Sequence, residues 1–250
     1  KFDAILPSFL AAIFANYFCD VWQISHHTHY SISTVVALTP ATVLWAVLAG
    51  IIFGLASLLF SKSTHFWGNT FKKLIKYPPL RPVIGGIILA ITWYLIGTTK
   101  YMGLGVPTIV DAFNIDLNSY DFILKLLFTS FTLGAGFKGG EVTPLFFIGA
   151  TLGNVLIWFI PLPMPLLAGM GFVAVFAGAT NTPIACTIMG IELFGIESGI
   201  FIALACITSY LFSGYSGIYS AQIIGSPKHV FYNNEKGLTL TDVDNKRSKN

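Results

Sequence analysis

Charged side chains are scarce in this sequence: lysine, arginine, aspartate and glutamate make up 10% of its 250 residues, against roughly a quarter in soluble domains. Hydrophobic residues reach 54%, and phenylalanine alone occurs 22 times. A soluble domain of this size needs more polar surface than this composition supplies. The net charge of +3 is small and spread along the chain, so nucleic-acid binding is not indicated. The composition therefore predicts a membrane protein.

Cysteine is also rare. The three cysteines, Cys19, Cys186 and Cys206, form an odd and scattered set, so we interpret them as buried apolar side chains and not as a disulfide framework. The chain opens Lys-Phe-Asp, without an initiator methionine or the pattern of a signal peptide. We therefore expect it to be a piece of a longer protein.

Apolar segments separated by glycine, proline and polar residues predict an all-α fold. We expect helices at 5–17, 40–60, 82–98, 103–113, 122–133, 144–159, 165–177, 183–194, 199–212 and 219–224. Several are shorter than the roughly 20 residues that a simple membrane crossing needs. Short, interrupted apolar segments are typical of transporters that build sites from broken helices. Gly50 and Gly54 have the spacing that lets membrane helices approach closely.

The placement of charge predicts a topology. The main basic cluster follows the second predicted helix: Lys62, Lys72, Lys73, Lys76 and Arg81. Under the positive-inside rule we expect this cluster to form a cytoplasmic loop, and we expect the polar tail, residues 228–250, to be disordered on the same side. A loop with His26, His27 and His29 then lies outside. Because acidic and cysteine partners are missing nearby, a wet loop is favoured over a metal site.

One carboxyl group stands out in the apolar second half. Glu141 is the only charged residue between Lys138 and Ile191, and an ionisable side chain among membrane segments indicates a functional site. It follows a glycine-rich stretch and precedes a helix that Pro144 is expected to begin. Backbone N–H groups and the positive end of a helix dipole then face whatever binds there. We interpret this as an anion site in a transporter; the alternative is a helix-start carboxylate at the aqueous surface.

Three motifs resemble one known family. Residues Gly139 to Pro144, Gly-Gly-Glu-Val-Thr-Pro, resemble the third signature of the CLC chloride channel and transporter family, usually written Gly-Gly-x-Phe-x-Pro. Residues 169–192 are similar to that family's late helices, and 217–221 to the segment with its anion-coordinating tyrosine, here Tyr219. The match extends to about residue 224. It covers the second half of the fold and lacks the Gly-Ser-Gly-x-Pro loop and the gating glutamate of the first half.

The resemblance has further implications. It implies a bundle of full and partial transmembrane helices that forms the second inverted repeat of a homodimer. Glu141 and Thr143 replace a hydrophobic and a small residue of most chloride-handling members, which resembles the bacterial fluoride/proton antiporter branch. The resemblance assigns fluoride handling to Glu141, Thr143 and Tyr219, and it implies that the amides of Glu141 and Val142 face the central anion. Because Val142 replaces the usual phenylalanine, the chloride-site geometry does not transfer directly.

The chemistry of fluoride fits these residue types. Fluoride is small and strongly hydrated, so a dry site must replace water with short donor hydrogen bonds. The Thr143 hydroxyl, the Tyr219 phenol and the helix-terminal amides that follow the Gly139-Gly140 loop are such donors. A carboxylate beside the anion repels it, so Glu141 either leaves the path or takes up a proton. Proton and anion occupancy are then linked, as exchange requires.

The same residues allow simpler interpretations. Thr143 before Pro144 fits an ordinary N-cap followed by a proline at the first helical position. Tyr219 fits a tyrosine at the membrane interface. Lys138 is better explained as a marker of the membrane surface than as an anion attractor. Glu192, in an apolar helix, is expected to pair with a structural donor.

Two rival functions remain open. The first is a chloride channel or chloride/proton exchanger. The second is a rhomboid-like intramembrane serine protease, because Gly214-Tyr215-Ser216-Gly217 fits the Gly-x-Ser-Gly motif. That chemistry needs a histidine within reach of Ser216, whereas we expect every histidine in a polar loop or tail.

The combined expectation is a multi-pass, non-enzymatic protein of the bacterial inner membrane. Residues 1–227 are expected to form the transmembrane domain and 228–250 a cytoplasmic tail. The expected partners are fluoride or chloride, protons and the lipid bilayer, with no cofactor, metal or nucleic acid.

Overall fold

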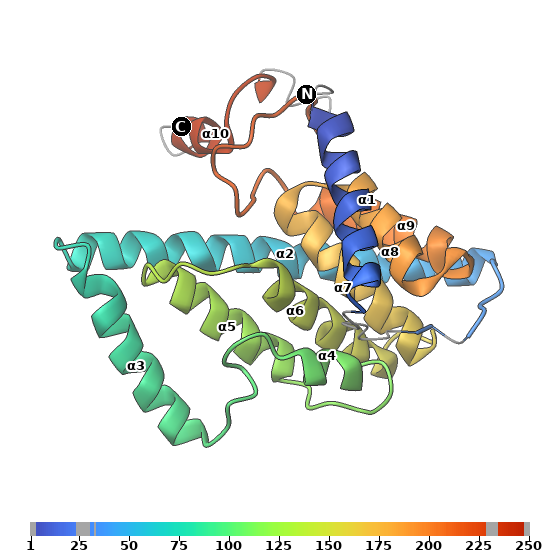
Figure 1. The fold of residues 1–250 in the computed structure, drawn as a ribbon, viewed down its shortest axis with the longest axis horizontal. Coiled ribbons are helices and arrows are strands. Elements are labelled where there is room, and N and C mark those ends of the chain that lie inside the picture. The colour runs from blue at the N-terminus through green and yellow to red at the C-terminus, as the bar shows by residue number, and fades with distance from the viewer. Residues whose placement is uncertain (1–3, 24–30, 33, 229–234, 248–250) are drawn as a thin grey trace.

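The structure, a computed structural model, describes residues 4–23, 31–32, 34–228 and 235–247. These residues contain helices and one isolated β-bridge, so the predicted all-α fold is confirmed (Figure 1). The longer helices are α1 (Ile5–Val21), α2 (Pro40–Leu74), α3 (Leu80–Ile96), α4 (Val106–Asp111), α5 (Asp121–Gly134), α6 (Val142–Val155), α7 (Met164–Thr180), α8 (Pro183–Phe194), α9 (Gly199–Phe212) and α10 (Leu240–Arg247). Two short 3₁₀ helices, η2 (Leu156–Trp158) and η3 (Ile196–Ser198), follow α6 and precede α9.

Helices α2, α6, α7 and α9 form the packed centre of the chain. At the crossing of α6 and α7, a Cβ atom on Gly149 would lie 2.0 Å from the carbonyl oxygen of Gly171. At the crossing of α2 and α9, a Cβ atom on Gly54 would lie 2.8 Å from the carbonyl oxygen of Ser209. Gly50 packs against α9 in the same way, so the predicted close approach at Gly50 and Gly54 is confirmed.

Helix α2 is longer than predicted. It begins at a capping box in which the Thr42 amide donates to Thr39 Oγ1 at 3.2 Å and the Thr39 amide donates to Thr42 Oγ1 at 2.9 Å. The expected end near residue 60 is wrong, and the helix continues to Leu74. Residues 61–74 contain no proline, and the last turn carries two lysines, which favour a helix C-terminus.

The basic cluster is therefore mainly helical. Lys62, Lys72 and Lys73 belong to α2, and Arg81 belongs to α3. Only Lys76 of the five lies in the turn between the two helices. The prediction of a basic loop is wrong for the other four residues.

Most of the apolar helices are shorter than the roughly 20 residues that a simple membrane crossing needs, as the sequence predicted for several of them. Within the described residues, α2 is the one helix that is long and apolar enough to cross a membrane by length and composition. The other apolar helices have 10–17 residues. Helices α1 and α3 expose large apolar side chains such as Phe9 and Leu95, and α3 diverges from the centre of the bundle (Figure 1). These exposed side chains need lipid or another protein surface to cover them.

The C-terminal region differs from the prediction. Residues 219–224, expected as a helix, form turns and the bridge, and the Ile224 amide donates to the Leu238 carbonyl at 2.9 Å. The predicted disorder of the tail is wrong for residues 235–247. There, Leu240 and Val243 are buried against Tyr215 and Ile224. These apolar contacts offset the ordering of a segment that is polar overall.

The cysteines follow the prediction only in part. Cys186 and Cys206 are buried, Cys19 is exposed on α1, and all three are free. Buried packing is therefore wrong for Cys19. The histidine loop predicted at 26–29 lies outside the described residues.

Candidate anion site

Glu141 occupies the N-cap of α6, with φ −93° and ψ −12°. Its carbonyl oxygen accepts a hydrogen bond from the Leu145 amide at 3.1 Å. Val142 and Thr143 are the first two helical residues and Pro144 is the third. The prediction that Thr143 caps the helix and Pro144 begins it is therefore wrong by two residues. Proline is tolerated in this first turn because N–H groups there have no intrahelical acceptor.

This helix start leaves backbone donors for a ligand. The amides of Val142 and Thr143 precede the first intrahelical donor, Leu145, and Pro144 contributes none. They stand at the positive end of the α6 dipole. The side chains of Glu141 and Thr143 are half-buried, and Val142 is exposed. An anion is the ligand that such a helix N-terminus favours.

Gly139 and Gly140 line a cavity beside this helix start. Both are exposed, and a Cβ atom on either would meet no atom within 4 Å, so contacts within the described chain do not require glycine there. The cavity has a volume of about 530 Å³ and lies between α3, α5 and the residues preceding α6. Its ionisable lining includes Lys125 and Lys138 and, among the described residues, no carboxylate. The positive charge favours an anion in this cavity.

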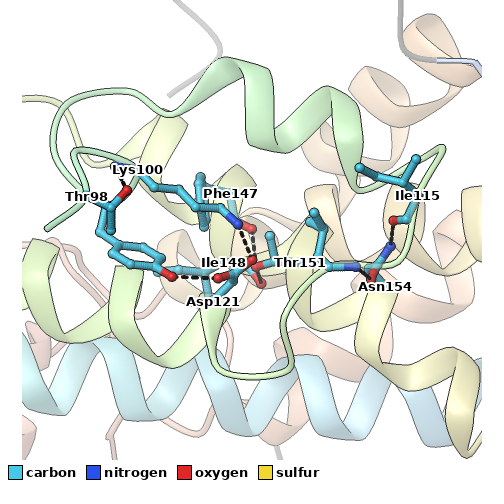
Figure 2. Close-up of polar contacts among 10 residues, drawn as sticks. Thr98, Lys100, Ile115, Asp121, Phe147, Ile148, Thr151 and Asn154 are labelled. Atoms are coloured by element: carbon cyan, nitrogen blue, oxygen red, sulfur yellow. Dashed lines mark hydrogen bonds and ion pairs between the residues drawn. The ribbon is translucent and has the colours of Figure 1, made fainter. Parts of the chain in front are cut away.

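A buried polar cluster supports the same region. Asp121, at the start of α5, is fully buried. Its carboxylate pairs with the Lys100 ammonium (Figure 2) and accepts a hydrogen bond from the Tyr101 hydroxyl at 2.6 Å. The charge on Asp121 is thus compensated, as burial requires.

Lys125 connects this cluster to α6. The residue is 1% exposed. Its ammonium donates to the Gly103 carbonyl at 2.6 Å and lies 5.0 Å from the centre of the Phe147 ring, a cation–π distance. We did not single out Lys125 or Asp121 from the sequence. The signal was present, since charged residues at the start and within an otherwise apolar helix indicate a special role.

The other end of α6 is anchored by Asn154. Its side-chain amide donates to the Ile115 carbonyl at 2.8 Å (Figure 2). The same amide donates to the Ala112 carbonyl at 2.9 Å, and the side-chain oxygen accepts from the Leu117 amide at 3.0 Å. The side chain is 2% exposed. Contacts near both ends therefore hold α6 against the residues on either side of α4.

Tyr219 lies on the segment after α9 and is 47% exposed. The Ile218 amide donates to the Ala179 carbonyl of α7 at 3.0 Å, and His65 Nε2 of α2 lies 3.0 Å from the Gly217 carbonyl oxygen. Among the described residues, these hydrogen bonds tie the segment to α2 and α7. A site shared by Tyr219 and the α6 start stays a prediction.

The histidine prediction is wrong for His65, which lies on α2 and not in a loop. Its Nε2 faces the Gly217 carbonyl, and a carbonyl is only an acceptor, so this nitrogen must carry the proton. Nε2 is therefore already engaged as a donor and is not the base that Ser216 needs in a protease.

Two other charged residues lie at the surface of the chain. Lys138 is exposed, which fits a surface position. Glu192 is exposed on α8, so burial does not demand a partner for it. Among the described residues, no cluster of histidine, cysteine and carboxylate side chains could hold a metal.

Comparisons with known proteins agree with the fold. Residues 1–214 match the voltage-gated chloride channel family. A chloride/fluoride channel protein of Pseudomonas syringae pv. tomato is 49% identical over 235 residues, which are 92% of this chain and 52% of that protein. A solved CLC-type fluoride/proton antiporter is 35% identical with a TM-score of 0.83, over 87% of this chain and 55% of the other.

A slow cyanobacterial Cl⁻/H⁺ antiporter has a TM-score of 0.60 at 18% identity, over 89% of this chain and 51% of the other, and supports the fold alone. The chain spans about half the length of these relatives. The family match excludes the rhomboid interpretation. The chain is thus a member of the voltage-gated chloride channel family, the CLC family that its motifs resemble.

Proposed function

We propose that this chain belongs to a membrane transporter that exchanges fluoride for protons, with the start of α6 as its anion site. The proposal rests on the position of Glu141 at the α6 N-cap, beside amides without an intrahelical acceptor. The names of two relatives, a chloride/fluoride channel protein and a fluoride/proton antiporter, support fluoride as the substrate.

The proposed mechanism couples one carboxyl group to the anion. Fluoride accepts hydrogen bonds from the α6 amides, the Thr143 hydroxyl and the Tyr219 phenol. A charged Glu141 side chain repels the ion, and protonation removes that repulsion. A fluoride ion from one side of the membrane therefore binds when Glu141 has taken up a proton from the other side. Exchange follows when the fluoride leaves toward the side from which the proton came and the proton leaves toward the side from which the fluoride came. The two occupancies are linked in both directions.

We also propose a setting for this activity: a multi-pass homodimer in the bacterial inner membrane. The exposed apolar faces of α1 and α3 support burial in lipid or against a partner. In this arrangement residues 1–227 are embedded and the tail, 228–250, lies in the cytoplasm. Cross-linking in native membranes tests the dimer.

Reconstitution into liposomes tests the exchange. The protein, produced from its own gene, is expected to release fluoride down its gradient while protons move in the opposite direction, as followed with a fluoride electrode and a pH-sensitive dye. Glu141→Gln is expected to slow release at least about tenfold or to uncouple it, because the removed charge is expected to be essential in the low dielectric. The matched control is Glu192→Gln, an exposed carboxylate on α8. Normal coupled transport by Glu141→Gln would contradict the proposal.

Chloride is the second candidate substrate. The family description favours it. The same liposomes loaded with either ion separate the two candidates. We expect faster fluoride release, and we expect Thr143→Val to slow fluoride more than chloride because the smaller ion depends more on short donor hydrogen bonds. Faster chloride release would reverse the assignment.

A further inference from the structure

The peptide group between Gly217 and Ile218 lies immediately before Tyr219 and is held by two hydrogen bonds. The carbonyl of Gly217 and the amide of Ile218 belong to the same planar unit. His65 Nε2 lies 3.0 Å from that carbonyl oxygen, and the amide donates to the Ala179 carbonyl at 3.0 Å. The peptide is therefore held from one side by α2 and from the other by α7.

The surroundings of Gly217 leave this peptide little room to shift. Gly217 is buried, and a Cβ atom there would lie 2.8 Å from Asn181 Nδ2 and 3.0 Å from Leu240 Cδ1. Asn181 in turn donates to the Gln222 side chain at 3.1 Å. The residues on both sides of Tyr219 are thus fixed, while the Tyr219 side chain itself is 47% exposed.

The contact with α2 requires a donor. Because the Gly217 carbonyl can only accept, His65 must present Nε2–H. A buried carbonyl that loses its donor pays the cost of desolvation. Of the two hydrogen bonds that hold this peptide, only the one from the Ile218 amide to the Ala179 carbonyl is then left. His65 is 152 residues away in sequence, so only the fold brings it to this peptide.

We propose that His65 is a positioning residue: from α2 it orients the 217–218 peptide and thereby aims the Tyr219 hydroxyl at the transported anion. The role of Tyr219 rests on the proposed function, whereas the effect of His65 on the segment does not. His65 is inferred to act through Tyr219 and not to touch the anion.

The test compares variants that remove the hydrogen-bond donor at position 65 with a variant that removes the histidine but keeps a donor. His65→Leu keeps a good helix former but removes the donor, and His65→Gln restores an N–H group on a side chain of similar reach. Asn69→Leu is the matched control, because it removes an exposed polar side chain from the same face of α2 one turn later. Each variant is made in the whole protein and checked by size-exclusion chromatography. His65→Asn, too short to reach, replaces His65→Leu if the latter does not fold.

Two measurements are made on each variant. Hydrogen–deuterium exchange of residues 214–222 is expected to accelerate about fivefold in His65→Leu, the factor expected for loss of one neutral hydrogen bond. The apparent KM for fluoride is expected to rise severalfold in the same variant with a smaller change in maximal rate. His65→Gln is expected to return both values toward those of the unmodified protein, and Asn69→Leu to change neither.

The outcomes distinguish the two proposals. Unchanged exchange in His65→Leu, or equal effects of leucine and glutamine, would overturn the role of His65. If the liposomes move chloride and not fluoride, the proposed substrate fails. The exchange data still decide the His65 contact in that case, and the KM comparison is then made with chloride.

Discussion

Helices α1 and α7 have the same length and similar apolar character but opposite environments. Each has 17 residues; no residue of α1 is buried within this chain, whereas fourteen residues of α7 are. The difference lies in side-chain size. Seven residues of α7 are glycine or alanine, against three alanines in α1. Because lipid is as apolar as a leucine side chain, membrane helices associate where small residues let their backbones meet.

Hydropathy thus identifies the helices, and small residues decide which of them is central. The contact between α6 and α7 shows how little space is left for a side chain at such a crossing. The two helices meet backbone to backbone at Gly149 and Gly171, where a Cβ on either glycine would lie about 2 Å from the other's carbonyl oxygen. No residue of α1 is buried within this chain, so contacts within the chain impose no such requirement there.

The largest expected effect comes from Gly149→Ala. The new methyl group would meet the α7 backbone, which cannot rotate away as a side chain can. Overpacking of a core costs about 1–3 kcal/mol even where side chains can adjust, so we expect little folded protein, as measured by fluorescence-detected size-exclusion chromatography. The matched change is Ala11→Leu on α1, which adds more volume at an exposed position. We expect the Ala11→Leu protein to elute normally. An equal loss of folded protein in the two variants would show that close backbone approach is not what distinguishes the packed helices α6 and α7 from the exposed helix α1.

A smaller effect is expected from Asp121→Ala at the edge of the packed centre. This change leaves the Tyr101 hydroxyl and the Lys100 ammonium without their shared acceptor. Removing one partner of a buried ion pair costs about 3–5 kcal/mol, and the partial exposure of Lys100 places the expected loss near the lower value. Thermal unfolding in detergent measures it. Asp116→Ala, at an exposed position, is the control, and similar melting temperatures for the two variants would contradict a stabilising role for the cluster.

Local patterns in the sequence predicted the elements that local chemistry determines. The bounds of α8 and α9 match the prediction, because Pro183 begins one helix and a glycine follows its end. The end of α2 and residues 219–224 were predicted wrongly. In α2, the basic residues resemble a loop yet are good helix formers. After α9, the apolar run is held by partners in the tail and not by its own helical hydrogen bonds.

The residues of the candidate site also divide into those that the sequence predicted and those that only the fold revealed. Glu141, Val142 and Thr143 were found together because adjacency in sequence places them on one helix start. The partner of Lys125 on α6, Phe147, and the peptide that His65 contacts depend on packing between distant segments. No periodicity in a single sequence carries that information, so these residues emerged only from the fold.

The smallest expected effect lies in the polar helix α10, outside both the packed centre and the apolar arms. Its start is a reciprocal cap in which the Asp242 amide donates to Thr239 Oγ1 at 3.2 Å, and the Thr239 amide and hydroxyl donate to the Asp242 carboxylate at 3.2 Å and 2.6 Å. These hydrogen bonds hold the pKa of Asp242 below its ordinary value. Asp242 is fully exposed to solvent, so we expect its charge to stabilise the start of α10 only weakly and we expect salt to screen this stabilisation.

The lowered pKa of Asp242 sets the sign of the pH dependence. The folded form binds the proton less tightly, so the stabilisation is present above the unfolded pKa of about 4 and is lost as pH falls through the folded value. We expect Asp242→Asn to accelerate hydrogen exchange in α10 slightly at neutral pH. After correction for intrinsic rates, the unmodified protein should approach the variant below about pH 4. A pH-independent difference between the two would show that the carboxylate charge does not stabilise this helix start, in contrast to the buried carboxylate of Asp121.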